Sequence, residues 1–479
     1  MADFRLIADR IAGDIAAGRL RPGQQLPPQR WFARRHRIAP STAGRIYGEL
    51  VRRGLVVGEV GRGTFVRAAP AVAHGRALIE TATSAPVNLE LNYPSAEGQS
   101  ELLAASLAPL LRGDVLTEAM RPGAADGTVA ARESAARLLA LPGWRPEPAQ
   151  LLFTGNARQA IAAALASLVR PGGRVGVEEL TYPLVKEIAG RLGVVLVPLA
   201  GDAEGVRPDA LAAVHRAAPL SALYLQPTLH NPTSSTMSER RRRELGRMVV
   251  EWGLPVVEDR IWSFLRPDAA AFAAHAPGLT HVVDGLSKRV APGLTVGFLV
   301  VPQDRVEAVG AAVRSGGWSA GTFALEAAVR WTGDGVVRRL VEAKRADVAR
   351  RQAILTEHLI ERLGGHVTGH ATGRLGGQLT GQLTRRLDGQ LAGGAVRTDP
   401  HAYFAWWELP APWRADTFTA AAAAHGIAVT PGTAFAVDPH RTPDAVRLGL
   451  ASAPEGELAR ALRTLADVAA GGPPGSAGG

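Results

Sequence analysis

Three polar side chains, Asn231, Asp259 and Lys288, each follow a short apolar run of the kind that forms a β-strand. Lys288 is one of only three lysines in the chain, and a lysine with a lowered pKa can form a Schiff base with an aldehyde, which an arginine cannot. Pyridoxal phosphate (PLP) needs such a lysine, a carboxylate that keeps its pyridine nitrogen protonated, and a donor to its phenolate oxygen. The order of these three residues therefore predicts a PLP site.

Each of these residues also has a purely structural interpretation. An aspartate after a strand usually caps a helix, and an Asn-Pro pair such as Asn231-Pro232 usually forms a turn. Their shared position at strand ends favours the PLP site over coincidence. The remaining lysines, Lys186 and Lys344, lie on helix-like stretches, so we interpret them as surface charges.

The positive charge of the chain is concentrated near its N-terminus. Residues 1–70 hold thirteen arginines and five acidic residues, so they carry +8 of the formal net charge of +10. Basic charge gathered in one small domain is typical of a protein that binds a polyanion, although a solvated helix surface gives the same signal.

Composition excludes several classes of protein. The chain has no cysteine, which excludes disulfides, thiolate metal sites and cysteine nucleophiles, and no metal site is predicted. No apolar run is as long as a membrane span, and the first residues lack the apolar core of a signal peptide. We therefore expect a cytoplasmic protein without a membrane segment.

Residues 1–67 show the pattern of three helices followed by a hairpin. Apolar residues recur at helical spacing over 3–17, a second helix starts at Pro27-Pro28 and runs to about His36, and we expect Ser41 and Thr42 to cap a third. Strands are expected at 55–57 and 64–66, joined by a glycine-rich turn. This is a winged helix-turn-helix, in which the third helix enters the major groove of double-stranded DNA.

The same segment resembles the GntR family of bacterial regulators. The resemblance rests on Gly18-Arg19-Leu20-Arg21-Pro22-Gly23-Gln24-Gln25-Leu26-Pro27, Ser41-Thr42, Gly54-Leu55 and Gly63-Thr64-Phe65-Val66. The residues that it implies for DNA binding are Arg30, Ser41, Thr42, Arg45, Arg62 and Thr64. Pro40 departs from the family, which usually has an arginine there, so the operator is expected to differ.

The rest of the chain alternates short apolar runs with helical stretches. Runs at 151–153, 175–177 and 222–225 lead into helices expected at 157–169, 183–192 and 238–252. Strands that alternate with helices predict an α/β fold with a largely parallel sheet, whose ligands lie at the carboxyl ends of the strands. The domains expected are a head at 1–67, a linker at 68–86, a body at 87–465 with a low-complexity insertion at 364–397, and a disordered tail at 466–479.

The body resembles the fold type I, aspartate-aminotransferase-like PLP enzymes, which have a large α/β domain and a small C-terminal α+β domain. The motifs that carry the resemblance are Gln226-Pro227-Thr228-Leu229-His230-Asn231-Pro232-Thr233, Glu258-Asp259, Ser287-Lys288, Ala291-Pro292-Gly293 and Val446-Arg447-Leu448-Gly449. Together with a GntR head, this is the arrangement of the MocR regulators.

The resemblance implies a role for each site residue. Lys288 would form the Schiff base, Asp259 would pair with the pyridine nitrogen, and Asn231 would donate to the ring oxygen. Tyr182 would stack on the ring, and Arg447 would bind the α-carboxylate of an amino acid through its planar fork. The further residues expected around the cofactor are Asn156, Ala157, Arg158, Ser287, Arg289 and Trp262.

Three positions depart from the enzymes. Thr295 stands where they place an arginine for the cofactor phosphate, Trp262 stands near the place of a common tyrosine, and Met120 stands where a tyrosine often reaches the partner subunit's phosphate. Arg158 or Arg289 would then have to supply the missing cation. The loss of these groups favours a site that senses a ligand over one that turns it over.

The sequence thus predicts a homodimeric, PLP-dependent transcriptional regulator that binds a DNA operator. It would sense an amino acid or amine through formation of an external aldimine. Two alternatives remain: a competent aminotransferase with a DNA-binding head, and a regulator that keeps the scaffold but binds its effector without PLP.

Overall fold

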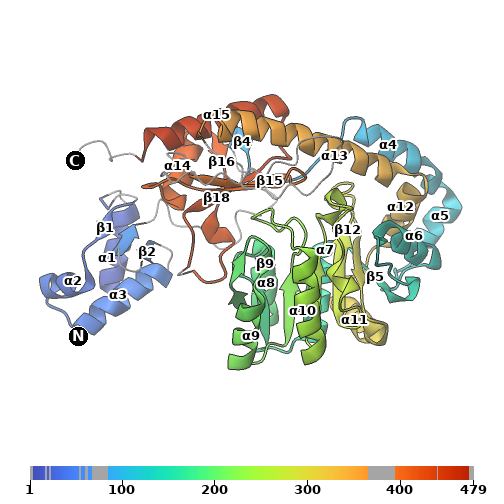
Figure 1. Ribbon diagram of the computed structural model, residues 1–479, viewed down its shortest axis with the longest axis horizontal. Helices are drawn as coiled ribbons and strands as arrows, with labels where there is room; N and C mark the ends of the chain where they lie inside the picture. Colours follow the sequence, from blue (N-terminus) through green and yellow to red (C-terminus); the bar gives the residue numbers. More distant parts are fainter. Residues whose placement is uncertain are drawn as a thin grey trace.

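A computed structural model describes residues 4–16, 19–20, 23–52, 55–59, 63–66, 85–364, 394–439 and 441–473. Figure 1 shows a small head in blue, a large sheet with helices on both sides, and a smaller sheet in red and orange that lies beside the carboxyl-terminal helices. The predicted linker, the insertion and Arg62 fall mostly or wholly outside the described residues.

The head contains the three predicted helices and the hairpin. They are α1 (Phe4–Ala16), α2 (Gln29–His36), α3 (Pro40–Arg52), β2 (Val56–Glu59) and β3 (Gly63–Val66). A short strand that we did not predict, β1 (Gln25–Leu26), pairs antiparallel with β3 and completes a sheet of order β1-β3-β2. Apolar residues at helical spacing, including Ile11, Phe32 and Ile46, form the core of the head. The winged helix-turn-helix is therefore confirmed.

The start of α3 differs from the prediction. The carbonyl oxygen of Ala39 accepts hydrogen bonds from the backbone N–H groups of Thr42 (2.9 Å) and Ala43 (3.1 Å), so the helix begins at Pro40. Ser41 and Thr42 thus lie inside the first turn and do not cap it. The physical reason is that proline has the φ angle of a first helical residue and no N–H that would need a cap.

The large domain is built on a seven-stranded sheet of order β5-β13-β12-β11-β10-β6-β7. The strands are β5 (Leu151–Thr154), β6 (Arg174–Glu178), β7 (Val195–Leu199), β10 (Ala222–Leu225), β11 (Val256–Asp259), β12 (Thr280–Gly285) and β13 (Gly297–Val300). All are parallel except β13, which runs antiparallel to both β12 and β5. The expected, largely parallel sheet is confirmed.

Helices cover both faces of this sheet. Apolar residues of α7 (Ala157–Leu168), α8 (Pro183–Leu192) and α11 (Val306–Ser315) pack on one face, and those of α9 (Pro208–Ala217) and α10 (Glu239–Trp252) pack on the other. Both faces of the central strands are therefore apolar, as parallel sheets require. The remaining elements of this part are α4 (Gln99–Leu107), α5 (Gly113–Ala119), α6 (Val129–Leu139), α12 (Thr322–Gly333), and the hairpin β8 (Gly201–Asp202) and β9 (Gly205–Val206).

The long helix α13 (Val336–Leu355) leads from the large domain to the small one, as Figure 1 shows. The small domain has an antiparallel sheet of order β14-β15-β18-β17. Its elements are β14 (Ala395–Arg397), β15 (Phe404–Glu408), α14 (Ala415–Ala424), β17 (Thr430–Pro431), β18 (Ala445–Gly449) and α15 (Glu455–Gly471). A separate pair joins β4 (Val87–Asn88) to β16 (Ile427–Ala428), so the segment after the linker belongs to this end of the protein.

The predicted tail begins too early. Helix α15 continues to Gly471 and buries Ala466 and Ala469 in the core of the small domain, although both lie in the segment expected to be disordered. Alanine and glycine make the segment look featureless in sequence, but alanine is the best helix former and packs closely. Among the described residues, no helix is long and apolar enough to cross a membrane.

Candidate active site

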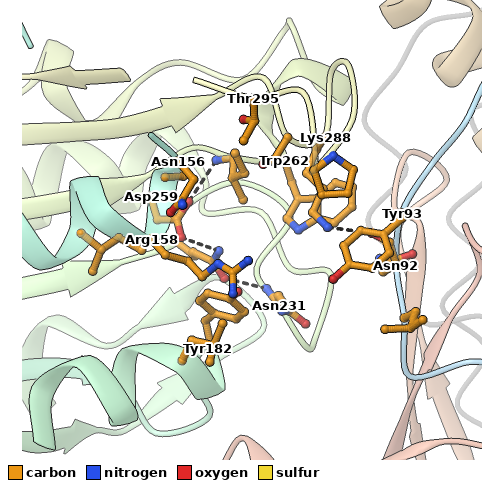
Figure 2. A pocket seen from close by; sticks show the side chains of 18 of the residues that line it. Asn92, Tyr93, Asn156, Arg158, Tyr182, Asn231, Asp259, Trp262, Lys288 and Thr295 are labelled. Atoms are coloured by element: carbon orange, nitrogen blue, oxygen red, sulfur yellow. Dashed lines mark hydrogen bonds between the residues drawn. The ribbon is translucent and has the colours of Figure 1, made fainter. Parts of the chain in front are cut away.

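A cavity of about 230 Å³ opens at the carboxyl ends of the parallel strands. Loops after β10, β11 and β12, the start of α7, and strand β18 of the small domain contribute side chains to it. Of the predicted site residues, the cavity is lined by Asn156, Ala157, Arg158, Tyr182, Asn231, Asp259, Trp262, Ser287, Lys288 and Arg447. Figure 2 shows most of these side chains pointing toward one space.

Lys288 reaches into this cavity from the loop after β12. Its Nζ donates to the backbone oxygen of Asn92 (2.7 Å) and lies over the rings of Tyr93 (4.4 Å) and Trp262 (5.0 Å). Burial first, and then the positive charge of Arg447, lower the pKa of the Lys288 amine to about 7. A large fraction of the amine is therefore neutral near pH 7, and it is the neutral form that attacks an aldehyde.

The turn that carries Lys288 is held by a second lysine. Lys344 of α13 has no exposed surface, and its Nζ donates to the backbone oxygens of Lys288 (3.1 Å), Arg289 (3.0 Å) and Val290 (2.7 Å). Lys186 is half-buried and donates to the backbone oxygen of Ala436 (2.9 Å). The prediction that both are surface charges is wrong, because the spacing of residues along a helix does not show which other segments pack against it.

Asp259 ends β11 and is fully enclosed. Its Oδ2 accepts from the hydroxyl of Tyr224 (2.6 Å) and from Nε2 of Gln226 (3.0 Å), and its Oδ1 accepts from the backbone N–H of Ile261 (3.0 Å). Burial raises the pKa of the Asp259 carboxyl to about 6, while these hydrogen bonds oppose the rise. A cation beside it would favour the ionised carboxylate, so the group suits a protonated ring nitrogen.

Asn231 and Asp259 are linked by Gln226. The Oε1 of Gln226 accepts from the backbone N–H of Asn231 (3.0 Å), so one amide fixes both loops. The Oδ1 of Asn231 is buried and has no hydrogen-bond partner among the described residues. The ring oxygen of the cofactor needs a donor, so Asn231 fits it through the Nδ2 of its cavity-lining amide and not through Oδ1, which is an acceptor. Sequence reasoning did not assign Gln226, although it opens the Gln-Pro-Thr motif.

The first turn of α7 forms the end of the cavity suited to a phosphate. Asn156 caps this helix by accepting from the backbone N–H of Gln159 (3.1 Å), and Ala157 and Arg158 follow it. Gly297 of β13 packs so closely on this loop that a Cβ would lie 2.5 Å from the backbone of Asn156. The backbone N–H groups of a helix start and the Arg158 guanidinium favour an anion there.

The structure brings only one of the two expected compensating arginines to the cavity. Thr295, which the resemblance places at the position of an arginine, lines the cavity, and so does Arg158. Arg289 instead turns away into the protein, where its guanidinium pairs with Asp284 (2.8 Å for one of the two contacts) and donates to the backbone oxygen of Gly285 (3.0 Å). This buried ion pair holds the guanidinium of Arg289 outside the cavity lining, so it is not placed to bind a phosphate there.

Arg447 reaches the cavity from β18 of the small domain. It donates to the backbone oxygen of Glu90 and to the hydroxyl of Thr430 (3.1 Å), and its guanidinium lies 5.5 Å from the ring centre of Phe435. Burial lowers the pKa of Arg447 to about 10, so it remains charged near pH 7. Its buried Nε has no partner among the described residues, which leaves capacity to bind a carboxylate.

Two aromatic residues complete the walls. Tyr182 precedes α8, and burial raises the pKa of its phenol, which therefore stays protonated. Trp262 is buried against Tyr403 and Phe404, with ring centres 6.3 and 5.6 Å away, and turns one face toward Lys288. The segment from Glu90 to Tyr93 also lines the cavity, and sequence reasoning missed it because it carries no motif.

The predicted DNA-binding residues lie on the head. Arg30 and Ser41 are exposed, Thr42 and Thr64 are partly exposed, and exposed Arg45 holds its guanidinium 4.2 Å from the ring centre of Phe4. Figure 1 shows α3 on the side of the head that faces away from α14.

Comparison with known proteins places the two parts in known families. Residues 117–465 match the family model of aminotransferase class I and II, and residues 5–66 match that of the bacterial regulatory proteins of the gntR family. The chain therefore belongs to the aminotransferase class I and II family. With the GntR head it has the MocR-like architecture of transcriptional regulators.

Similar proteins include regulators and enzymes. YdeF of Bacillus subtilis, described as an HTH-type transcriptional regulator, is 29% identical over 357 residues, which cover 74% of this chain and 77% of YdeF. PdxR of Corynebacterium glutamicum, an HTH-type pyridoxine biosynthesis transcriptional regulator, is 24% identical over 362 residues, 74% of this chain and 78% of PdxR. LysN, the α-aminoadipate aminotransferase of Thermus thermophilus, solved with N-(5′-phosphopyridoxyl)-L-leucine, has a TM-score of 0.66 at 20% identity, over 80% of this chain and 92% of LysN. Members of this fold use PLP.

Proposed function

We propose that this regulator holds PLP through Lys288. An amino acid or amine competes with Lys288 for the aldehyde of PLP, and this competition changes the affinity of the head for DNA. The observation that carries the proposal is the convergence of Lys288, Asp259 and Asn231 in one cavity. PLP, when bound, would supply an electrophilic aldehyde and a positively charged ring. Lys288 would hold the aldehyde, Asp259 the ring nitrogen, and Arg158 the phosphate.

A chain of contacts runs from the cavity to the head. Arg447 lies on β18, and Asp444 just before this strand accepts from the backbone N–H of Ala415 (3.2 Å) at the start of α14. The preceding residue, Arg414, places its guanidinium 4.9 Å from the ring centre of Phe65 on β3 of the head. A ligand that shifts Arg447 would therefore also shift the start of α14, which contacts the head. This supports coupling between the cavity and the head.

We propose that the protein acts as a homodimer. Large apolar side chains are exposed on one part of the large domain: Leu111 (65%), Met120 (80%) and Val129 (61%). They lie around α5 and α6, and exposed apolar patches of this kind often mark a protein interface. Two heads on one dimer would match two half-sites of an operator.

The second candidate function is transamination, in which the amino group of an amino acid passes to a keto acid. The lowered pKa of Lys288, at about 7, is what a catalytic lysine needs to move a proton once it is released from the cofactor. Against it stand Thr295 and Trp262, which replace groups that the enzymes use. We therefore place sensing first, and multiple-turnover transamination decides between the two.

The test starts from duplexes selected by the purified full-length protein out of a random pool. Affinity for a selected duplex is then measured with and without PLP and with a panel of amino acids and amines. We expect PLP and at least one amino compound to change the affinity several-fold, and Lys288→Ala to abolish the change. Arg414→Ala should weaken the change but keep cofactor binding. Affinity that is indifferent to cofactor and amino compounds would refute the sensing role.

A further inference from the structure

The cavity contains one charged group that the proposed function does not use. Its lining has three cations, Arg158, Lys288 and Arg447, and two carboxylates, Glu90 and Asp259. PLP and an α-carboxylate would engage every one of these except Glu90. Glu90 interacts electrostatically with Arg447, and an α-carboxylate bound to Arg447 would offset that charge, so the half-buried carboxylate favours a further cation in the cavity.

The structure holds Glu90 firmly at the cavity wall. The Oδ1 of Asn88 accepts from the backbone N–H groups of Glu90 (2.8 Å) and Leu91 (3.0 Å), and the backbone oxygen of Glu90 accepts from Arg447. Asn92 is held in turn by the backbone N–H of Ala451, which donates to its Oδ1 (3.1 Å). The segment therefore has little freedom to carry the Glu90 side chain away.

The Glu90 carboxylate itself makes no hydrogen bond and no ion pair within 4 Å with any residue in the described part of the chain. Arg447 is close enough to lower its pKa, but burial outweighs this effect and raises the pKa of Glu90 to about 7. One nitrogen of Arg447 donates to the backbone oxygen of Glu90 and to Thr430, and its unpaired Nε is left for the α-carboxylate, so Arg447 gives the Glu90 carboxylate no hydrogen bond. A ligand cation would supply the partner that the carboxylate lacks.

The aromatic side chains nearby are suited to the same kind of group. Tyr93 is on the same segment as Glu90, and Figure 2 shows it across the cavity from Asp259 and Arg158. Its ring and that of Trp262 already hold an ammonium group, the Nζ of Lys288, at 4.4 and 5.0 Å from the ring centres. Ring faces and a carboxylate that line one cavity suit an ammonium or guanidinium group.

We propose that the effector is an amino acid with a second, distal cationic group. Its α-carboxylate binds Arg447, and its distal cation binds Glu90 beside the ring of Tyr93. An acidic side chain would meet the like charge of Glu90, and an apolar side chain would leave the carboxylate unpaired. This inference rests on the proposed function, because it assumes that the ligand occupies the cofactor cavity.

The first experiment uses the unmodified full-length protein loaded with PLP. Dissociation constants are measured by isothermal titration calorimetry for L-ornithine, L-lysine, L-arginine, L-norleucine, L-glutamate and 1,5-diaminopentane. L-norleucine is the matched control, because it has the chain of lysine without the ε-amine. We expect at least one basic amino acid to bind about 10- to 100-fold more tightly than L-norleucine, the effect of one charged hydrogen bond. We expect L-glutamate and the diamine to bind more weakly than the best basic amino acid.

The second experiment changes the carboxylate alone. Glu90→Gln keeps the size of the side chain and removes its charge, so the ratio of norleucine to basic amino acid dissociation constants should fall close to one. Glu101→Gln, an exposed position on α4 outside the cavity, is the matched control and should keep the ratio of the unmodified protein. If Glu90→Gln does not fold, the comparison of ligands on the unmodified protein still decides the question.

The outcomes separate this inference from the proposed function. If L-norleucine or L-glutamate binds as tightly as every basic amino acid, or Glu90→Gln keeps the preference, the inference is wrong and the sensing role stands. If the diamine binds as tightly as the best basic amino acid, the α-carboxylate contact is wrong and the inference falls with it. If no amino compound binds the loaded protein or alters its cofactor absorbance, the proposed function fails and the inference fails with it.

Discussion

Lys344 is a positioning residue whose removal should disturb the cofactor site without touching the cofactor. Lys344→Met keeps the length of the side chain but removes the three hydrogen bonds to the backbone oxygens of residues 288–290. Val290 keeps one donor, Nε2 of Gln99 at 3.2 Å, whereas the oxygens of Lys288 and Arg289 have no other partner among the described residues. Two buried carbonyls therefore lose their only donor.

The magnitude follows from this count. A buried carbonyl left without a donor costs about 1–3 kcal/mol, so two such groups cost about 2–6 kcal/mol. Methionine no longer requires an ammonium to be buried, which offsets part of this cost, and we expect a net loss of about 2–4 kcal/mol. The Lys344 charge also lowers the pKa of Lys288, so its removal should raise that pKa and reduce the neutral amine at pH 7.

Two measurements test this reasoning. Urea unfolding followed by tryptophan fluorescence gives the change in stability, and the rate at which PLP absorbance shifts on mixing with apoprotein gives the reactivity of Lys288 from pH 6 to 9. Lys186→Met is the matched control, because Lys186 is half-buried and donates only to Ala436. We expect Lys344→Met to unfold at lower urea and its rate profile to move to higher pH. If Lys344→Met matches the unmodified protein in both, the positioning role is refuted.

Four further outcomes are expected. Lys288→Ala should lose the absorbance of lysine-bound PLP yet fold, and a borohydride-reducible adduct in that variant would contradict the assignment. Arg158→Ala should lower the affinity for PLP and Thr295→Arg should raise it, because charged donors bind a phosphate more strongly than neutral ones. If equilibrium dialysis finds neither change, Arg158 does not bind the phosphate. Arg45→Ala should weaken DNA binding and make the slope of log affinity against log salt shallower by about 0.9. Arg10→Ala on α1 should change neither the affinity nor the slope. Anisotropy titrations that find equal slopes for the two variants would contradict the placement of DNA on α3. The pKa of Lys288 is lower in the folded protein than in the unfolded chain, so between about pH 7 and pH 10 the unfolded chain binds one proton more. The stability of the apoprotein should therefore rise with pH over this range. If the urea midpoint of Lys288→Ala rises as steeply with pH, Lys288 is not the source of the rise.

The sequence by itself determined where helices and strands form and which strand ends carry the candidate site residues. Apolar periodicity placed helices α7, α8 and α10 within two residues of their observed bounds. The rule that ligands meet at strand ends placed Asn231, Asp259 and Lys288 in one cavity. These inferences succeed because secondary structure and strand direction follow from spacing along the chain, which is local information.

Other features were decided only by the tertiary structure, because they depend on partners far away in the sequence. Lys288 donates to Asn92, 196 residues earlier, and no local pattern marks Asn92 or its neighbour Glu90 as part of the site. The helix-like stretch around Lys344 does not show in sequence that this side chain faces the turn after β12. Arg289 stands next to Lys288 in sequence, but a buried ion pair with Asp284 holds it outside the cavity. The sequence offered several side chains as equally good candidates for the site. The packing of distant segments, which brings their charges together, decided which of them line the cavity.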